Sequence, residues 1–218
     1  MRDIVISKIA ETKLIAIVRG IADKELCLKV VRAIFEGGIG LIEVTFNQSE
    51  PHNFSHTTDA ISAICKEFGD KVCVGAGTVL TPQQVKMAAE AGAKYIISPS
   101  ADCRVIQKTR ELGLVSIPGV VTPTEIAMAM DAGADFCKLF PAGNFGCEYI
   151  KAIKAPLSHV KILAVGGINA ENIPQFLASG CDGFGIGSNL VNLKWAKAGE
   201  YEKITQVARS LCDAVEQA

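Results

Sequence analysis

Two long charged side chains stand inside runs of residues that otherwise have the composition of buried β-strands. Lys138 lies in DFCKLFP, and Glu43 lies in GLIEVTF. Lysine and glutamate are almost never fully buried unless they are paired. Burial lowers the pKa of a lysine, and the neutral amine can then attack a ketone and form a Schiff base. The residue types therefore predict an enzyme in which Lys138 is the nucleophile toward a keto acid.

Glu43 is the matching candidate for proton transfer. Burial raises the pKa of a carboxyl group toward neutral pH, where the group can both accept and donate a proton. The alternative is that Lys138 and Glu43 form a buried ion pair with a purely structural role. Such a pair adds little stability relative to apolar packing, so the catalytic interpretation is favoured for both residues.

Glycine-rich turns follow two of the later apolar runs, in AVGGIN and GIGSNL. Glycine lets backbone N–H groups approach an anion closely. Glycines are also typical of ordinary tight turns, which is the alternative interpretation. The candidates to bind a phosphate group are Gly166, Gly167, Gly187 and Ser188.

Two further residues are candidates to contact an anion such as a carboxylate. Thr78 ends the GAGT motif, where an ordinary strand-to-helix turn is the alternative. Arg19 ends the apolar run IAIVRG, where it could instead cover the end of the sheet.

The cysteines and histidines do not have the spacing of a metal site. The eight cysteines include no C-x-x-C pair, and His52 and His56 lie in SEPHNFSHTT, which is typical of a solvated loop. Zinc normally needs three or four protein ligands. We therefore expect no metal, no cofactor and no disulfide framework.

Eight apolar, β-branched runs must position these side chains, and helical patterns lie between them. The runs begin at Leu14, Leu41, Lys71, Lys94, Leu114, Asp135, Val160 and Asp182. Thr81-Pro82 and Thr122-Pro123 are typical helix starts, and a glycine follows most of the helical patterns. Near-continuous apolar strands indicate a parallel sheet that is covered on both faces. We predict an α/β fold, a single-domain (β/α)8 TIM barrel over residues 1–218.

An open doubly wound sheet is the alternative fold, although its first unit lacks the G-x-G-x-x-G turn. In a barrel the catalytic groups stand at the carboxyl ends of the strands, and the loops after the seventh and eighth strands often bind phosphate. In the sixth strand Phe136, Lys138 and Phe140 share one face, because side chains alternate along a strand. The barrel therefore places Lys138 at its mouth, near the two glycine-rich turns.

Composition excludes several classes of partner. Among 218 residues, Lys plus Arg number 22 and Asp plus Glu number 23, which gives a formal net charge of -1. A nucleic-acid partner is not expected, because there is no basic excess for a phosphate backbone. The N-terminal segment has the pattern of neither a signal peptide nor a membrane span. We expect a cytoplasmic protein with no membrane contact.

Seven motifs resemble one known family. They are EVTFN at Glu43, VGAGTVLTPQQV at Val74, YIISP at Tyr95, IPGVVTPTE at Ile117, KLFPAG at Lys138, AVGGIN at Ala164 and GIGSNL at Gly185. Together, from about Leu14 to Leu190, they resemble the 2-keto-3-deoxy-6-phosphogluconate (KDPG) / 4-hydroxy-2-oxoglutarate (KHG) aldolase family. The resemblance implies a class I aldolase on a trimeric (β/α)8 barrel that uses no metal.

The resemblance also implies roles for individual residues. Lys138 would form the Schiff base, Glu43 would be the general acid/base, and Thr78 would hold the carboxylate of pyruvate. Pro99, which only the resemblance supplies, would line the pocket together with Phe140. The phosphate would bind at Gly166, Gly167, Gly187 and Ser188.

Two positions depart from the phosphogluconate-type pattern. Where an arginine usually follows the catalytic glutamate by four residues, this chain has Asn47, and where a threonine usually precedes the Gly-Gly pair, it has Val165. Both changes, together with Arg19, resemble the branch that acts on 2-keto-3-deoxy-6-phosphogalactonate, the C4 epimer. Asparagine cannot make the bidentate charged contact of an arginine, so Arg19 would contact the carboxylate. Valine lacks the hydroxyl that could distinguish the two epimers.

The predicted reaction is retro-aldol cleavage of the phosphogluconate-type acid, or of KHG, to pyruvate plus glyceraldehyde 3-phosphate or glyoxylate, by a homotrimer. An aldolase specific for the C4 epimer is the alternative. A phosphosugar isomerase or epimerase on the same barrel would need a metal or a second acid/base residue. A non-catalytic barrel that binds a phosphorylated keto acid is the third class.

Overall fold

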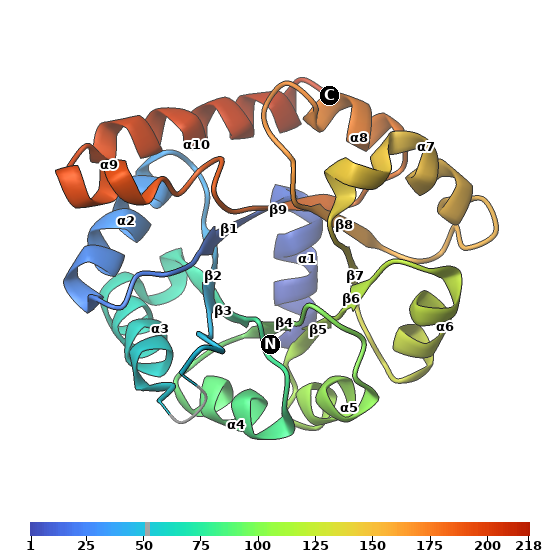
Figure 1. Cartoon of the computed structure of the whole chain (residues 1–218), viewed down its shortest axis with the longest axis horizontal. Helices are drawn as coiled ribbons and strands as arrows, with labels where there is room; N and C mark the ends of the chain where they lie inside the picture. Colours follow the sequence, from blue (N-terminus) through green and yellow to red (C-terminus); the bar gives the residue numbers. More distant parts are fainter. Residues whose placement is uncertain (51–52) are drawn as a thin grey trace.

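A ring of parallel strands forms the centre of the molecule, in a computed structural model that describes residues 1–50 and 53–218 (Figure 1). The strands are β1 (Leu14–Val18), β2 (Leu41–Thr45), β3 (Cys73–Gly77), β4 (Tyr95–Ile97), β5 (Val115–Ile117), β6 (Gly119–Val120), β7 (Cys137–Leu139), β8 (Ile162–Val165) and β9 (Gly183–Ile186). Their order in the sheet is β5-β4-β3-β2-β1-β9-β8-β7-β6, and every pairing is parallel.

The two ends of that order belong to one chain segment, which closes the barrel. β5 pairs with β4, and β6 pairs with β7. Pro118 separates β5 from β6; it has no N–H to donate, but its carbonyl accepts a hydrogen bond from the Lys138 N–H at 2.8 Å. The eight predicted strands are therefore confirmed, the fifth being split in two, and the open doubly wound sheet is excluded.

The helices form an outer ring around the strands, except for α1, which lies across the barrel axis (Figure 1). They are α1 (Arg2–Thr12), α2 (Lys24–Glu36), α3 (Ser55–Phe68), the 3-10 helix η1 (Gly69–Lys71), α4 (Pro82–Glu90), α5 (Cys103–Glu111), α6 (Pro123–Asp131), α7 (Ala142–Lys154), α8 (Ile173–Ala178), α9 (Leu193–Ala198) and α10 (Tyr201–Glu216). No helix among the described residues is long and apolar enough to cross a membrane.

Helix α1, which the sequence analysis did not predict, closes the amino-terminal end of the barrel. Val5 and Ile9 of α1 pack into an interior cluster with side chains from the strands. Asp135 ties this helix to the barrel wall: its carboxylate pairs with Arg2 and accepts a hydrogen bond from the Ser116 N–H at 2.9 Å. The barrel is therefore open at its carboxyl end alone.

The predicted helix boundaries are confirmed where they rested on capping residues. Thr81 with Gln84, and Thr122 with Glu125, form capping boxes in which each side chain bonds the other residue's backbone N–H. Five of the glycines with positive φ angles lie between a helix and the next strand: Gly38, Gly92, Gly113, Gly133 and Gly180. They permit a left-handed turn directly before the next strand.

One loop expectation is wrong in part. His56 lies in the first turn of α3, which begins at Ser55, because the neighbouring Thr57 is buried and its hydroxyl donates to the Thr45 carbonyl at 3.1 Å. His52 lies outside the described residues. All eight cysteines are free thiols, and burial raises the pKa of Cys27 and of Cys137 to about 12.

The half of the barrel interior that lies next to α1 is apolar, with one exception. Ile15, Leu41, Phe136 and Leu163 meet there, and the ring of Tyr95 lies against Gly75, where a Cβ atom would collide with it. The Tyr95 hydroxyl is buried and has no hydrogen-bond partner among the described residues. Burial raises the pKa of this phenol well above its ordinary value.

Tyr95→Phe is expected to leave the fold intact and to raise the free energy of unfolding by about 1 kcal/mol, because it removes a buried hydroxyl that has no partner. Tyr149→Phe is the control. The Tyr149 hydroxyl donates to the Val121 carbonyl at 2.7 Å, so its loss should lower the free energy of unfolding by about 1 kcal/mol. Urea unfolding of both variants measures the difference, and a destabilised Tyr95→Phe would contradict the prediction.

Candidate active site

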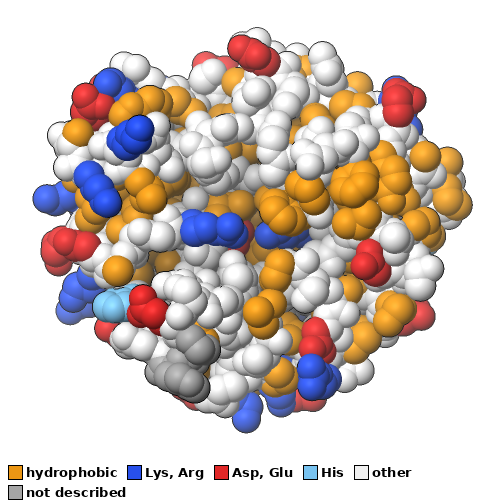
Figure 2. Space-filling model, viewed as in Figure 1, with side chains coloured by type: hydrophobic (Ala, Val, Ile, Leu, Met, Phe, Trp, Pro, Cys, Tyr) orange, Lys and Arg blue, Asp and Glu red, His pale blue; other side chains and the backbone are white. Residues whose placement is uncertain are grey.

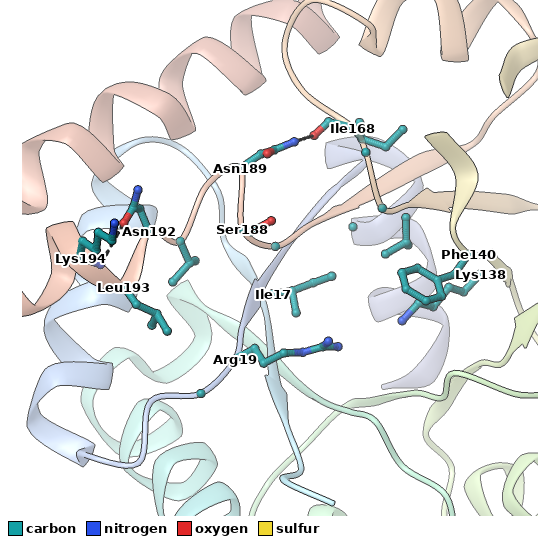
Figure 3. A pocket seen from close by; sticks show the side chains of 17 residues that line it. Ile17, Arg19, Lys138, Phe140, Ile168, Ser188, Asn189, Asn192, Leu193 and Lys194 are labelled. Atoms are coloured by element: carbon teal, nitrogen blue, oxygen red, sulfur yellow. Dashed lines mark hydrogen bonds between the residues drawn. The ribbon is translucent and has the colours of Figure 1, made fainter. Parts of the chain in front are cut away.

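A cavity of about 590 Å³ opens at the carboxyl ends of β1, β7, β8 and β9. Its wall includes eight residues that the sequence analysis singled out: Arg19, Lys138, Phe140, Val165, Gly166, Gly167, Gly187 and Ser188. Figure 3 shows Arg19 and Lys138 reaching toward each other from opposite sides of this cavity, with Phe140 beside Lys138. The strands therefore bring the proposed nucleophile and the glycine-rich turns to one place.

Lys138 stands in the middle of β7 and is 4% exposed. Burial lowers the pKa of its ammonium group, and the positive charge of Arg19 lowers it further, against the opposing effect of Glu43. The nitrogen lies 5.2 Å from the centre of the Phe140 ring. None of the ion pairs formed by the described residues includes Lys138. Its amine is therefore buried, destabilised as a cation and free to react.

Glu43 stands in β2 and is fully buried. Its carboxylate lies against Gly77 of β3, where any Cβ atom would collide with it. Neither oxygen has a hydrogen-bond partner in the described part of the chain. Burial raises the pKa of Glu43 above its ordinary value, although the charges of Lys138 and Arg19 lower it.

Lys138 and Glu43 form no direct ion pair with each other in the structure. The two groups influence each other's pKa, so their charges interact, but they make no contact that qualifies as a salt bridge or hydrogen bond. A buried pair with only a structural role would be expected to close that distance, because direct contact offsets the cost of desolvation. The missing contact therefore favours a catalytic role over a structural one.

Arg19 makes the mouth of the cavity positive. It follows β1 directly and is exposed, so its guanidinium can reach a bound anion. Figure 2 shows Lys and Arg side chains at the centre of the face that looks down the barrel axis. This charge favours substrates with a carboxylate or phosphate group.

The two glycine-rich turns form a rigid cradle at the far wall of the cavity. Gly166 and Gly167 have φ angles of 89° and 77°, which favour glycine. Asn172 Nδ2 donates to the Gly167 carbonyl at 2.9 Å, and Asn189 Nδ2 donates to the Ile168 carbonyl at 2.7 Å. No described residue accepts a hydrogen bond from the backbone N–H groups of Gly167, Gly187 or Ser188. These N–H groups can therefore bind an anion.

Four predicted residues are not among those that line this cavity: Glu43, which is fully buried, Thr78, Pro99 and Asn47. Thr78 directly follows Gly77 at the end of β3 and has a φ angle of 55°. Pro99 follows β4, with its backbone against Gly119. Asn47 lines a separate hollow of about 110 Å³ beside α3, and its side chain bonds Ser49 and Glu50.

Other parts of the cavity wall were missed from the sequence. Ile17 and Gly185 face the cavity from β1 and β9, and Asn189 and Asn192 follow β9. Asn189 had a signal that could have revealed it, since it directly follows the predicted anion-binding Ser188 in GSNL. Ile17 and Gly185 had none, because they have the same residue types as the buried strand interior.

The chain is similar to characterised aldolases over nearly its whole length. A family model described as KDPG and KHG aldolase matches residues 5–207. The chain is 39% identical to 2-dehydro-3-deoxy-6-phosphogalactonate aldolase of Escherichia coli (strain K12), over 94% of this chain and 95% of that one. It is 37% identical to the KHG/KDPG aldolase of the same strain, over 89% and 87%.

A solved structure supports the same relationship. The KDPG aldolase of Legionella pneumophila, with pyruvate captured as a covalent carbinolamine intermediate, superposes with a TM-score of 0.84 at 28% identity, over 94% of this chain and 97% of that one. The barrel, the buried lysine in β7 and the matched sequence all point the same way. This chain belongs to the KDPG and KHG aldolase family.

Proposed function

We propose that this chain is a class I aldolase that cleaves a 2-keto-3-deoxy-6-phospho sugar acid, or KHG, to pyruvate and an aldehyde. The observation that carries the proposal is the amine of Lys138, which is buried, unpaired among the described residues and open to a cavity lined by two glycine-rich turns. The covalent carbinolamine in the related Legionella enzyme supports the same chemistry here.

The reaction begins when the neutral Lys138 amine adds to C2 of the keto acid. The carbinolamine loses water and becomes an iminium ion. Glu43 accepts the proton of the C4 hydroxyl, the C3–C4 bond breaks, and its electron pair moves into the iminium to form an enamine and the free aldehyde. Glu43 returns a proton to C3, and water then hydrolyses the imine to release pyruvate and restore the Lys138 amine.

The remaining residues orient the substrate. Thr78 and Arg19 hold the carboxylate beside Lys138, and Phe140 and Pro99 border the three carbons that become pyruvate. A phosphate group binds at the N–H groups of Gly166, Gly167, Gly187 and Ser188. The imine itself withdraws electrons from the breaking bond, so the reaction needs neither a metal nor a cofactor.

The C4 epimer, 2-keto-3-deoxy-6-phosphogalactonate, is a second candidate substrate. Val165 lies in the cavity wall immediately before the Gly166 turn, and the E. coli relative named for the galactonate form is 39% identical. A valine at this position offers no hydrogen bond by which a hydroxyl could be distinguished.

The proposal extends to assembly and location. A homotrimer is supported by the family resemblance and by exposed apolar side chains, Met128 on α6 and Phe145 on α7. A cytoplasmic location is supported by the eight free thiols.

Borohydride in the presence of pyruvate should reduce the imine to a stable secondary amine on Lys138, identified by peptide mass spectrometry. Lys138→Arg keeps the positive charge but cannot form the imine, so it should abolish the adduct and lower turnover at least about thousandfold. Lys151→Arg, on an exposed face of α7, is the control and should behave as the wild type. Substantial turnover by Lys138→Arg would remove this residue from the mechanism.

Arg19→Met tests the electrostatics of the site. The charge of Arg19 lowers the pKa of both Lys138 and Glu43, so its removal should raise both. Because imine formation needs the neutral amine, the pH profile of imine formation with pyruvate should move to higher pH. Lys194→Met removes another cation of the cavity wall, one that does not appear among the causes of either shift, and should leave the profile in place. An unmoved profile in Arg19→Met would contradict the prediction.

Substrate choice is measured by pyruvate release from both epimers under identical conditions. Val165→Thr should raise the ratio of gluconate-derived to galactonate-derived cleavage about tenfold, because it adds one hydrogen-bonding group beside C4. An unchanged ratio would show that Val165 does not distinguish the epimers.

A further inference from the structure

Two glutamines that the mechanism does not use connect the loop after β2 to the loop after β3. Gln48 Nε2 donates to the Thr78 carbonyl at 2.7 Å. Gln84 Nε2 donates to Gln48 Oε1 at 3.3 Å. Gln84 Oε1 accepts the N–H groups of Leu80 and Thr81 at 2.7 and 3.1 Å. The two side chains thus form a continuous bridge that ends on Thr78.

The donors and acceptors allow only one direction along this bridge. The Leu80 and Thr81 N–H groups can only donate, so the Gln84 oxygen must face them and its NH₂ group must face Gln48. The Gln48 oxygen then accepts from Gln84, which leaves the Gln48 NH₂ group to donate to the Thr78 carbonyl. Gln84 is 2% exposed, so it has few alternative partners.

Thr78 needs such support because its backbone is strained. Its φ angle of 55° lies in the left-handed region, which is unfavourable for β-branched residues. Strained residues persist only where the surroundings hold them, and they concentrate at functional sites. Thr78 also adjoins Gly77, against which the Glu43 carboxylate lies.

We propose that Gln48 and Gln84 are positioning residues that hold Thr78 in its left-handed conformation, so that Thr78 can bind the carboxylate of the keto acid. The inference rests on the proposed function, since it takes the Thr78 contact from there. Gln48 is the more informative of the two, because Gln84 also caps the start of α4.

Gln48→Met keeps the length of the side chain and removes both its hydrogen-bond donor and its hydrogen-bond acceptor. The half-saturating concentration of pyruvate for borohydride trapping on Lys138 should rise about tenfold, the effect of losing one well-placed hydrogen bond. Trapping by methyl pyruvate, which keeps the ketone but lacks the carboxylate, should be unchanged. Gln83→Met, on the exposed side of the same helix α4, is the matched control and should change neither.

Two further variants separate positioning from a general loss of structure. Gln48→Glu still accepts a hydrogen bond from Gln84 but cannot donate one to the Thr78 carbonyl. It should therefore weaken the binding of pyruvate at least as much as Gln48→Met does. Thr78→Gly should by itself weaken the binding of pyruvate. Because glycine adopts a positive φ without support, adding Gln48→Met to Thr78→Gly should not weaken the binding further.

Each outcome bears on the proposal. Unchanged pyruvate trapping in a folded Gln48→Met or Gln48→Glu would overturn it, as would equal weakening of pyruvate and methyl pyruvate. The proposal would also be overturned if the double variant of Gln48→Met and Thr78→Gly bound pyruvate more weakly than Thr78→Gly alone. Absence of any pyruvate adduct in the wild type would instead refute the proposed function, so the two failures are distinguishable.

Discussion

A basic and an acidic side chain, Lys138 and Glu43, are both buried inside the barrel without direct contact, and much of the site depends on that arrangement. Direct contact would neutralise Lys138 and Glu43 and turn them into a structural pair. The barrel prevents this by placing them on β7 and β2, which are separated in the ring by other strands. Gly77 leaves room for the carboxylate on its own side of the interior. Desolvation then acts on each group separately, lowering one pKa and raising the other.

The parts of the fold that follow from local patterns could be predicted from the sequence. Each strand was visible as an apolar run, and the caps at Thr81 and Thr122 marked helix starts, because these signals arise within a few residues of chain. Lys138 and Glu43 were found for a related reason: a charge inside such a run conflicts with burial unless it has a specific use. Gly166 and Gly187, which lie in the cavity wall, were predicted from a different signal, the glycine-rich turns that follow two of the apolar runs.

Features that depend on distant partners could not be predicted in this way. Helix α1 has little contrast between its faces, and it is held through Val5, Ile9 and the pairing of Arg2 with Asp135, more than 100 residues away. The split between β5 and β6 depends on which neighbour each half pairs with. The bridge from Gln84, in the first turn of α4, to Gln48, in the loop after β2, joins residues that are 36 positions apart, and neither glutamine looks unusual in its own segment.

Because α1 closes the amino-terminal end of the barrel, the candidate active site is a cavity with a single entrance. Lys138 is buried, whereas Gly167 and Ser188 are exposed at the rim of the cavity. In an aldolase reaction the aldehyde half is therefore the first to leave, and the three-carbon half stays behind as a covalent enamine until the entrance is clear. In the direction of bond formation, the same architecture requires pyruvate to enter the cavity before its aldehyde acceptor.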